Sequence, residues 1–163
     1  MSFDLGVWNC EEPLTDAQAS ETYLRLCGEW PYLEGENAAV EAFYRELIQR
    51  WPEIDTILDD RVGDFDFSPW SCALKHSGRA VVMSCVWSKA ADVAQYVEAL
   101  ARKHGLLLFD PQANRVILPE HLVPPKRGFL QRMFRGAAVM SYVQSKAADV
   151  ARYVEALARK HGL

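Results

Sequence analysis

The sequence predicts an α+β fold in which helices pack on a mostly antiparallel sheet, with the element order β-α-α-β-β-α-β-β. Three observations lead to this prediction. Apolar residues alternate with polar ones in short segments, which is typical of half-buried strands. Apolar stripes at helical spacing occupy longer segments. Strand-like segments also come in pairs around short turn sequences, and hairpins pair their strands antiparallel.

The first strand and the first two helices have clear local signals. Residues 3–7 alternate apolar and small or polar side chains, which indicates a half-buried strand. Thr15 and Gln18 have capping-box spacing, Asn37 is a favourable second cap, and Pro52 ends that second helix. The expected apolar stripes are Ala19, Tyr23, Leu26 and Cys27 before a stop at Gly28, and Val40, Phe43, Tyr44, Leu47 and Ile48.

The second half of the domain reads as a hairpin, a helix and another hairpin. Residues 70–76 and 80–87 are expected strands around the turn Ser77-Gly78. Ser88 is the expected cap of a helix that ends at Gly105. Two further strands, 106–109 and 115–118, flank a proline-containing turn at 110–114. The expected buried stripe of the helix is Val93, Val97, Leu100 and Ala101.

Residues 80–106 recur almost unchanged as residues 137–163. Two copies do not make a solenoid, which needs at least three repeats, so we interpret the recurrence as a partial duplication. The chain then divides into an α+β domain (1–120), a basic linker (121–136) and a partial β-α duplicate (137–163). The copies differ at Val81/Ala138, Cys85/Tyr142, Trp87/Gln144 and Gln95/Arg152.

The duplicate keeps the whole apolar stripe of its helix. Because an apolar stripe is costly in water, we expect this segment to dock at a sheet edge or on another chain. A homo-oligomer formed through the duplicated segment is therefore one expectation.

Charge is distributed unevenly along the 163 residues. Residues 1–120 carry 20 acidic and 10 basic side chains, whereas residues 121–163 carry 2 acidic and 8 basic ones. Because binding to phosphates needs Lys and Arg, a domain with this acidic charge is not expected to bind nucleic acid. Its charge favours a basic protein as the partner. The sequence has no apolar run of membrane-spanning length and no signal-peptide pattern at its start, so we expect a cytoplasmic protein without a membrane partner.

No pattern of catalytic or metal-ligating residues stands out. The sequence contains no phosphate-binding glycine motif and no zinc-type spacing of Cys and His, so we expect no cofactor, no metal and no enzyme activity. His104 and His161 are expected at the surface, where a helix C-terminus favours them. The four cysteines, Cys10, Cys27, Cys72 and Cys85, are expected to be reduced core residues.

The candidate binding residues lie in an acidic segment and in aromatic loop positions. Residues 53–67 contain six carboxylates and one arginine, Arg61. Three interpretations of this segment are open: a solvated loop, a surface for a basic partner, or a catalytic or metal site. Three aromatic residues are either interface anchors or core residues. The full candidate set is Glu53, Asp55, Asp59, Asp60, Asp64, Asp66, Trp30, Tyr32 and Trp70.

Several segments resemble one family of small bacterial proteins. These are MSFDLGVW at the start, then TYLRLC, AFYREL, PEID, SPW, VMSCVW, LARKHGL and FDPQ. The family is similar to immunity proteins encoded beside polymorphic toxins, such as the Rhs-type effectors of type VI secretion. The resemblance covers about residues 1–119 and leaves the tail outside the pattern. It implies a protein that binds its cognate toxin in the cytoplasm and blocks the active site or its assembly, with no catalytic residues.

The acidic charge is compatible with a basic, nucleic-acid-cutting toxin as the partner. Two other classes of function stay open at this point. One is a small enzyme that reverses a toxin's modification, which would need a pocket with convergent polar groups. The other is a structural module that assembles through the duplicated segment.

Overall fold

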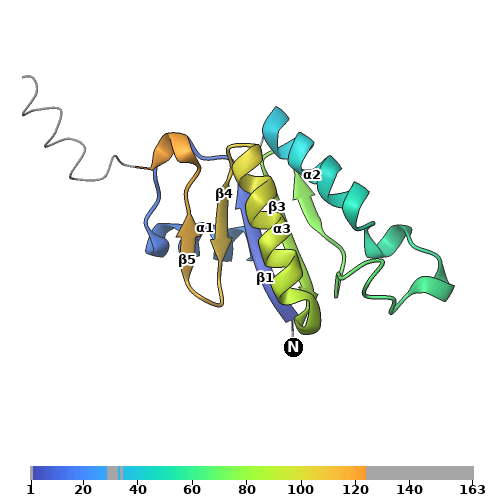
Figure 1. Ribbon diagram of the computed structural model, residues 1–163. Helices are drawn as coiled ribbons and strands as arrows, with labels where there is room; N and C mark the ends of the chain where they lie inside the picture. The colour runs from blue at the N-terminus through green and yellow to red at the C-terminus, as the bar shows by residue number, and fades with distance from the viewer. Residues whose placement is uncertain (1, 29–32, 34, 124–163) are drawn as a thin grey trace, which may run out of the picture. The chain divides into compact units, whose positions relative to one another are not determined.

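The α+β fold and its element order are confirmed for the domain. The computed structural model describes residues 2–28, 33 and 35–123 (Figure 1). The compact unit to which they belong spans Met1–Val123. The duplicate (137–163) and most of the linker (121–136) lie outside the described residues, as does the prediction that the duplicate docks.

Within the described residues, five strands form one sheet in which every pair of neighbours is antiparallel. The spatial order is β2-β3-β1-β4-β5, so the first strand lies in the centre. Its residue Val7 is opposite Val81 on one side and Leu108 on the other. The strands are β1 (Ser2–Trp8), β2 (Lys75–Ser77), β3 (Ala80–Val86), β4 (Leu107–Asp110) and β5 (Arg115–Ile117).

The central strand β1 is buried on both faces, which corrects the prediction of a half-buried strand. Phe3, Leu5 and Val7 belong to the larger core, whereas Trp8 belongs to a second core. Because successive side chains of a strand point to opposite faces, the two cores lie on opposite faces of the sheet. Gly6 is too small to signal burial in the sequence, which is why the second buried face was missed.

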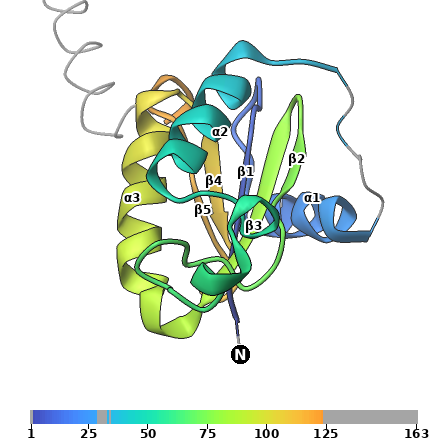
Figure 2. The same ribbon diagram turned by 90° about the vertical axis from the view of Figure 1, so that its right-hand side faces the viewer.

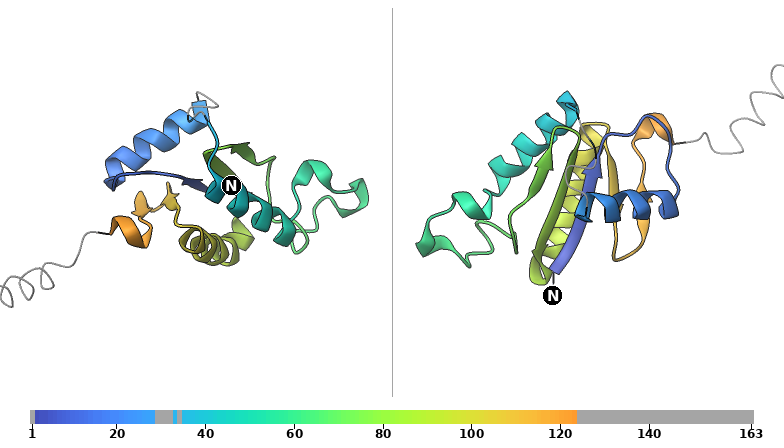
Figure 3. Two further views of the ribbon diagram at one scale, coloured as in Figure 1. Left: turned by 90° about the horizontal axis from the view of Figure 1, so that it is seen from above. Right: turned by 180° about the vertical axis from the view of Figure 1, so that it is seen from behind.

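The helices cover both faces of the sheet. Helix α1 (Asp16–Gly28) packs against the face that carries Trp8, through Ala19 and Leu26. Helices α2 (Ala38–Arg50) and α3 (Ala90–Lys103) pack against the other face. Figure 2 shows α2 and α3 on the same side of the strands, and Figure 3 shows α1 on the opposite side from α3.

Most of the predicted helix ends are confirmed. The backbone N–H of Thr15 donates to Gln18 Oε1 (2.9 Å), and Asn37 Oδ1 accepts from two backbone N–H groups of α2. Gly105 has a positive φ of 66°, and the N–H of the next residue donates to the carbonyl of Ala101, which closes a Schellman-type end. Ser88 does not cap α3. It lies in a 3-10 turn (Trp87–Lys89), and α3 begins after Lys89 without a side-chain cap.

The predicted apolar stripes are buried, with local exceptions. The stripe of α3 is buried as predicted, and in α2 Val40, Phe43 and Leu47 are buried. Cys27 is exposed, because it lies at the edge of the apolar stripe, about 100° around the helix from the buried Leu26.

Three further predictions on the second half of the domain are corrected. The predicted strand 70–76 is ordered as a strand only at its end, in β2, and Trp70 makes an isolated bridge to Cys85. Cys72 is exposed rather than a core residue. His104 is largely buried, because Glu46 of α2 reaches its side chain.

A cluster of charges joins α2 to the end of α3. Glu46 accepts a hydrogen bond from Lys103 Nζ (2.7 Å), and a second oxygen of Glu46 lies 3.2 Å from His104 Nε2. The Lys103 ammonium holds the pKa of Glu46 below its ordinary value, and His104 contributes in the same direction. A carboxylate whose pKa is lowered by folding stabilises the fold only while it is ionised.

We therefore expect Glu46→Gln to lose the acid-sensitive part of this stabilisation. The stability difference between the wild type and the variant should be present above the ordinary glutamate pKa of 4.5 and should shrink as the pH falls below it. Urea unfolding between pH 3 and 7 measures this. Glu120→Gln is the control, because Glu120 is exposed and makes no ion pair with the described residues. A stability difference between wild type and Glu46→Gln that does not change with pH would contradict a stabilising role for the ionised Glu46 carboxylate.

The four positions that differ between the two copies divide into buried and exposed ones. Cys85 is 1% exposed and packs in the larger core, whereas Gln95 is exposed on α3. We expect Cys85→Tyr, the residue of the second copy, to lower the free energy of unfolding by about 1–3 kcal/mol, because it overpacks the core. Gln95→Arg should change it by less than about 0.5 kcal/mol. Urea unfolding of the two variants checks the contrast, and equal stabilities would contradict it.

Candidate functional site

The acidic segment forms a loop that projects from the end of α2 and returns to the sheet beside it (Figure 1). It contains two short 3-10 turns, Ile54–Thr56 and Asp59–Arg61. The base of the loop is closed by two hydrogen bonds. Ser68 Oγ donates to the carbonyl of Pro52 (2.8 Å), and Trp70 Nε1 donates to the carbonyl of Trp51 (3.2 Å). A loop whose two ends meet in this way is positioned by the core beneath it.

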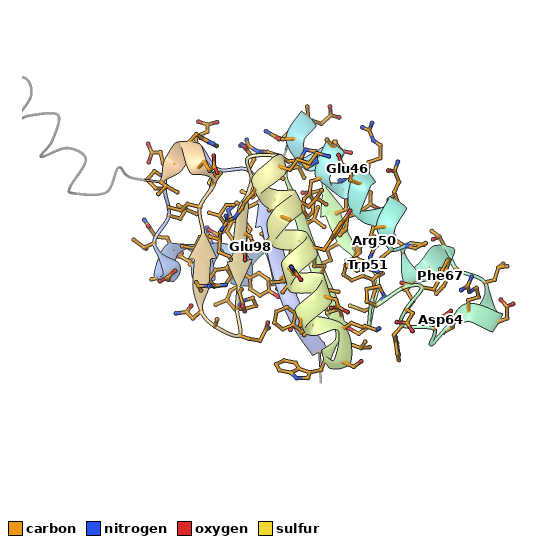
Figure 4. All side chains as sticks on the ribbon, viewed as in Figure 1. Glu46, Arg50, Trp51, Asp64, Phe67 and Glu98 are labelled. Carbon is orange, nitrogen blue, oxygen red and sulfur yellow. The ribbon has the colours of Figure 1, made fainter. Side chains whose placement is uncertain are left out.

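The far part of the loop is held together around Asp64. Arg61 donates to Asp64 Oδ2 (2.8 Å), and the other carboxylate oxygen accepts from the N–H of Phe67 (3.2 Å). The guanidinium of Arg61 also lies 3.9 Å from the centre of the Phe67 ring. Arg61 holds the pKa of Asp64 below its ordinary value, with the Phe67 N–H acting in the same direction. Figure 4 shows Asp64 and Phe67 on this loop, beyond Arg50 and Trp51.

The six predicted carboxylates have different surroundings. Glu53 accepts a hydrogen bond from the hydroxyl of Tyr44, and Asp66 pairs with Lys89 at the start of α3. Together with Asp64, these two carboxylates have partners inside the domain. Asp55 and Asp60 are exposed and make no hydrogen bond or ion pair with the described residues. Asp59 lies in the second 3-10 turn.

The structure does not bring the three aromatic candidates together in one binding surface. Trp30 and Tyr32 lie outside the described residues. Trp70 is only 1% exposed, and its ring packs edge-on against Trp51 (5.9 Å between centroids). Of the two roles left open for Trp70, the structure therefore supports the core role, which removes it from the candidate binding surface.

Sequence reasoning missed three apolar residues of the same loop. Leu58 is 74% exposed, Val62 is 57% exposed and Phe65 is 41% exposed. Exposed apolar side chains that gather on one loop are typical of sites that contact another molecule. Their spacing in the sequence resembles that of a buried stripe, so only the solvent exposure distinguishes them.

A groove lies beside the loop, between it and α3. It has a volume of about 470 Å³. Several of its lining residues, including Asp92 and Gln95, are exposed, so the groove is open to solvent. Its lining comes from the end of α2 (Arg50, Trp51), from the loop and its return (Phe65, Asp66, Pro69), and from the start and outer face of α3 (Lys89, Asp92, Gln95, Tyr96, Ala99).

Two groups of chemically active types, the Cys85 thiol and the His76 imidazole, have defined surroundings in the domain. Burial raises the pKa of the Cys85 thiol to about 11, so it stays protonated near neutral pH. His76 stacks on Tyr44 (3.7 Å between ring centroids), and its Nε2 lies 3.0 Å from Glu41 Oε1. Between residues 2 and 123, leaving aside 29–32 and 34, no three His, Cys, Asp or Glu residues are placed to hold a metal ion.

Comparison with known proteins adds no further assignment. The chain matches no protein-family model, no curated protein and no solved structure at a significant level. The resemblance to immunity proteins therefore stays a prediction that rests on the segments quoted for it. Among the helices of the described residues, none combines the length and the apolar character needed to cross a membrane.

The hydrogen bond from the hydroxyl of Tyr44 to Glu53 is expected to hold the start of the loop in place. We expect Tyr44→Phe to keep the stack on His76 but to free Glu53, at a cost of roughly 0.5–1.5 kcal/mol. Amide hydrogen exchange should then rise in residues 53–56. Tyr96→Phe is the control, because it removes the same atom from a hydroxyl that makes no hydrogen bond with the described residues. Unchanged exchange in Tyr44→Phe would show that the loop is fixed without this bond.

Proposed function

We propose that this protein is an immunity protein that binds a basic bacterial toxin and neutralises it by stoichiometric occlusion. The observation that carries the proposal is the loop at 53–67, which presents exposed apolar side chains and unpaired carboxylates. Two hydrogen bonds join the ends of this loop at the surface of the domain. The resemblance over residues 1–119 supports the same class of function. The partner expected from this resemblance is a secreted effector, with a nuclease as the favoured type.

The loop has the composition of an effective contact surface. Leu58, Val62 and Phe65 supply the apolar area that is removed from water on binding. Asp55 and Asp60 supply negative charge that attracts a basic partner during the encounter. The net charge of −10 over residues 1–120 acts in the same direction over a longer distance.

The base of the loop limits the entropy that binding would cost. Its ends are tied to the core, and its far part is held by the contacts of Asp64 and Arg61. A loop that is already ordered before binding loses less conformational freedom in the complex. A loop of this kind can block the active site of a toxin by contact alone, without a catalytic group in this protein.

The proposal predicts a toxin gene beside the gene of this protein, and co-expression with the product of such a gene tests it directly. We expect a one-to-one complex and protection that ends when the toxin exceeds this protein in molar amount. Light scattering of the purified complex measures the ratio, and titration of the toxin's activity measures the protection. Protection of a molar excess of toxin would indicate turnover and would favour an enzyme that reverses the toxin's modification.

Charge reversal on the loop tests which surface binds. We expect Asp55→Lys with Asp60→Lys to slow association with the toxin roughly tenfold at low salt, with a smaller effect at high salt. The matched control is Glu11→Lys with Glu12→Lys, which makes the same charge change at exposed positions before α1. Surface plasmon resonance at two salt concentrations gives the association rates. Equal rates for the two double variants would exclude the loop from the contact.

A further inference from the structure

Residues 80–106 occupy a place in the domain for which the sequence of residues 137–163 is also suited. Residues 80–86 form β3, which lies between β1 and β2, and residues 90–103 form α3, which packs on the larger core (Figure 2). The two copies differ at only four of 27 positions. A segment with nearly the same sequence can compete for the same place, within one chain or by exchange between two chains.

Most of the segment does not distinguish one copy from the other. The buried stripe of α3 recurs unchanged in the second copy. The one difference within α3, Gln95/Arg152, falls at an exposed position of the first copy. The residues of β3 that pack towards α1, Ala80 and Val82, are also the same in both copies. A preference for one copy must therefore come from the three remaining differences.

Two of these differences fall on the face of β3 that packs in the larger core. Val81 is 0% exposed and lies opposite Val7 of β1. Cys85 is 1% exposed, lies opposite Phe3 and makes a bridge to Trp70. An alanine in the place of Val81 would leave a cavity, and a tyrosine in the place of Cys85 would need room for a ring beside two aromatic residues.

The third difference adds a smaller preference in the same direction. Trp87 follows β3 directly and is 52% exposed, but its ring meets the ring of Phe3 edge to face, with 5.8 Å between the centroids. Glutamine, which the second copy has as Gln144, would lose this aromatic contact. All three differences therefore disfavour the second copy in the place of the first.

The reach of the chain does not prevent such a replacement. The 13 residues 124–136 separate the compact unit from the second copy. Fully extended, they span about 45 Å. A domain of this size has a diameter of about 35 Å. The side chains, rather than the length of the connection, must then decide which copy forms β3 and α3.

We propose that Ala138 and Tyr142 keep the second copy out of the place of β3 and α3, so that the duplication does not give the domain two alternative folds. The cavity at position 81 and the overpacking at position 85 each disfavour the replacement by roughly tenfold. The two positions are four residues apart on an extended strand, so their effects should multiply to roughly hundredfold. The replaced form would then be about 1% of wild-type molecules or less. This inference does not depend on the proposed function.

Restoring the residues of the first copy in the second one tests the proposal. In Ala138→Val with Tyr142→Cys and Gln144→Trp, the strand residues of the two copies are identical. After refolding from urea, we expect Cys85 to be displaced from the core in roughly a tenth to a half of the molecules, because only the cost of the longer connection still favours the first copy. A short pulse of iodoacetamide, analysed by mass spectrometry of peptides, measures this fraction and separates Cys85 from the introduced thiol. The wild type should show about 1% or less.

Arg152→Gln is the matched control, because it restores the fourth difference, which is exposed in the first copy. We expect it to leave Cys85 as protected as in the wild type. All of these substitutions lie outside the described domain, so its own core is unchanged. Replacement within one chain leaves a monomer and exchange between chains gives a dimer in light scattering, and either form with labelled Cys85 supports the proposal. Equal protection of Cys85 in the triple variant and the wild type, or rapid labelling of Cys85 in the wild type, would overturn it.

Discussion

The arrangement of the domain depends on one strand that is buried on both faces. Strand β1 pairs with β3 on one side and with β4 on the other, and its alternating side chains contribute to two separate cores. Gly6 is part of this constraint, because a Cβ at this position would lie 2.9 Å from the ring of Tyr23 on α1. A slip of the register by one residue would exchange the two faces and place Trp8 among the residues of α2 and α3. The register is therefore strongly specified.

The larger core also fixes the position of the acidic loop, which is the candidate binding surface. Trp51 follows α2 directly and meets both Trp70 and Tyr96, so the end of α2, the return of the loop and the face of α3 are fixed at one place. The acidic loop leaves and re-enters the domain at this place. Repulsion among its like charges is reduced because Tyr44, Arg61 and Lys89 each bind one carboxylate. The projecting loop is thus compatible with a defined conformation.

The carboxylates of the loop fall into two groups, those with a partner in the domain and those without one. Carboxylates that have partners hold the loop in place, whereas exposed ones stay available to another molecule. The apolar residues divide in the same way, since Trp70 supports the fold and Phe65 remains partly exposed. This division is the reason that a count of acidic and aromatic residues does not by itself define a binding surface.

The sequence by itself determined the order of the elements, most helix ends and the acidic character of the loop. These features depend on residues within a few positions of each other, as in the pair Thr15 and Gln18 or in the stripe of α3. Only the tertiary structure decided which carboxylates are paired, that Trp70 is buried and that Leu58 is exposed. Each of these depends on groups that are distant in the sequence, as Lys89 is from Asp66, and local patterns carry no record of such contacts.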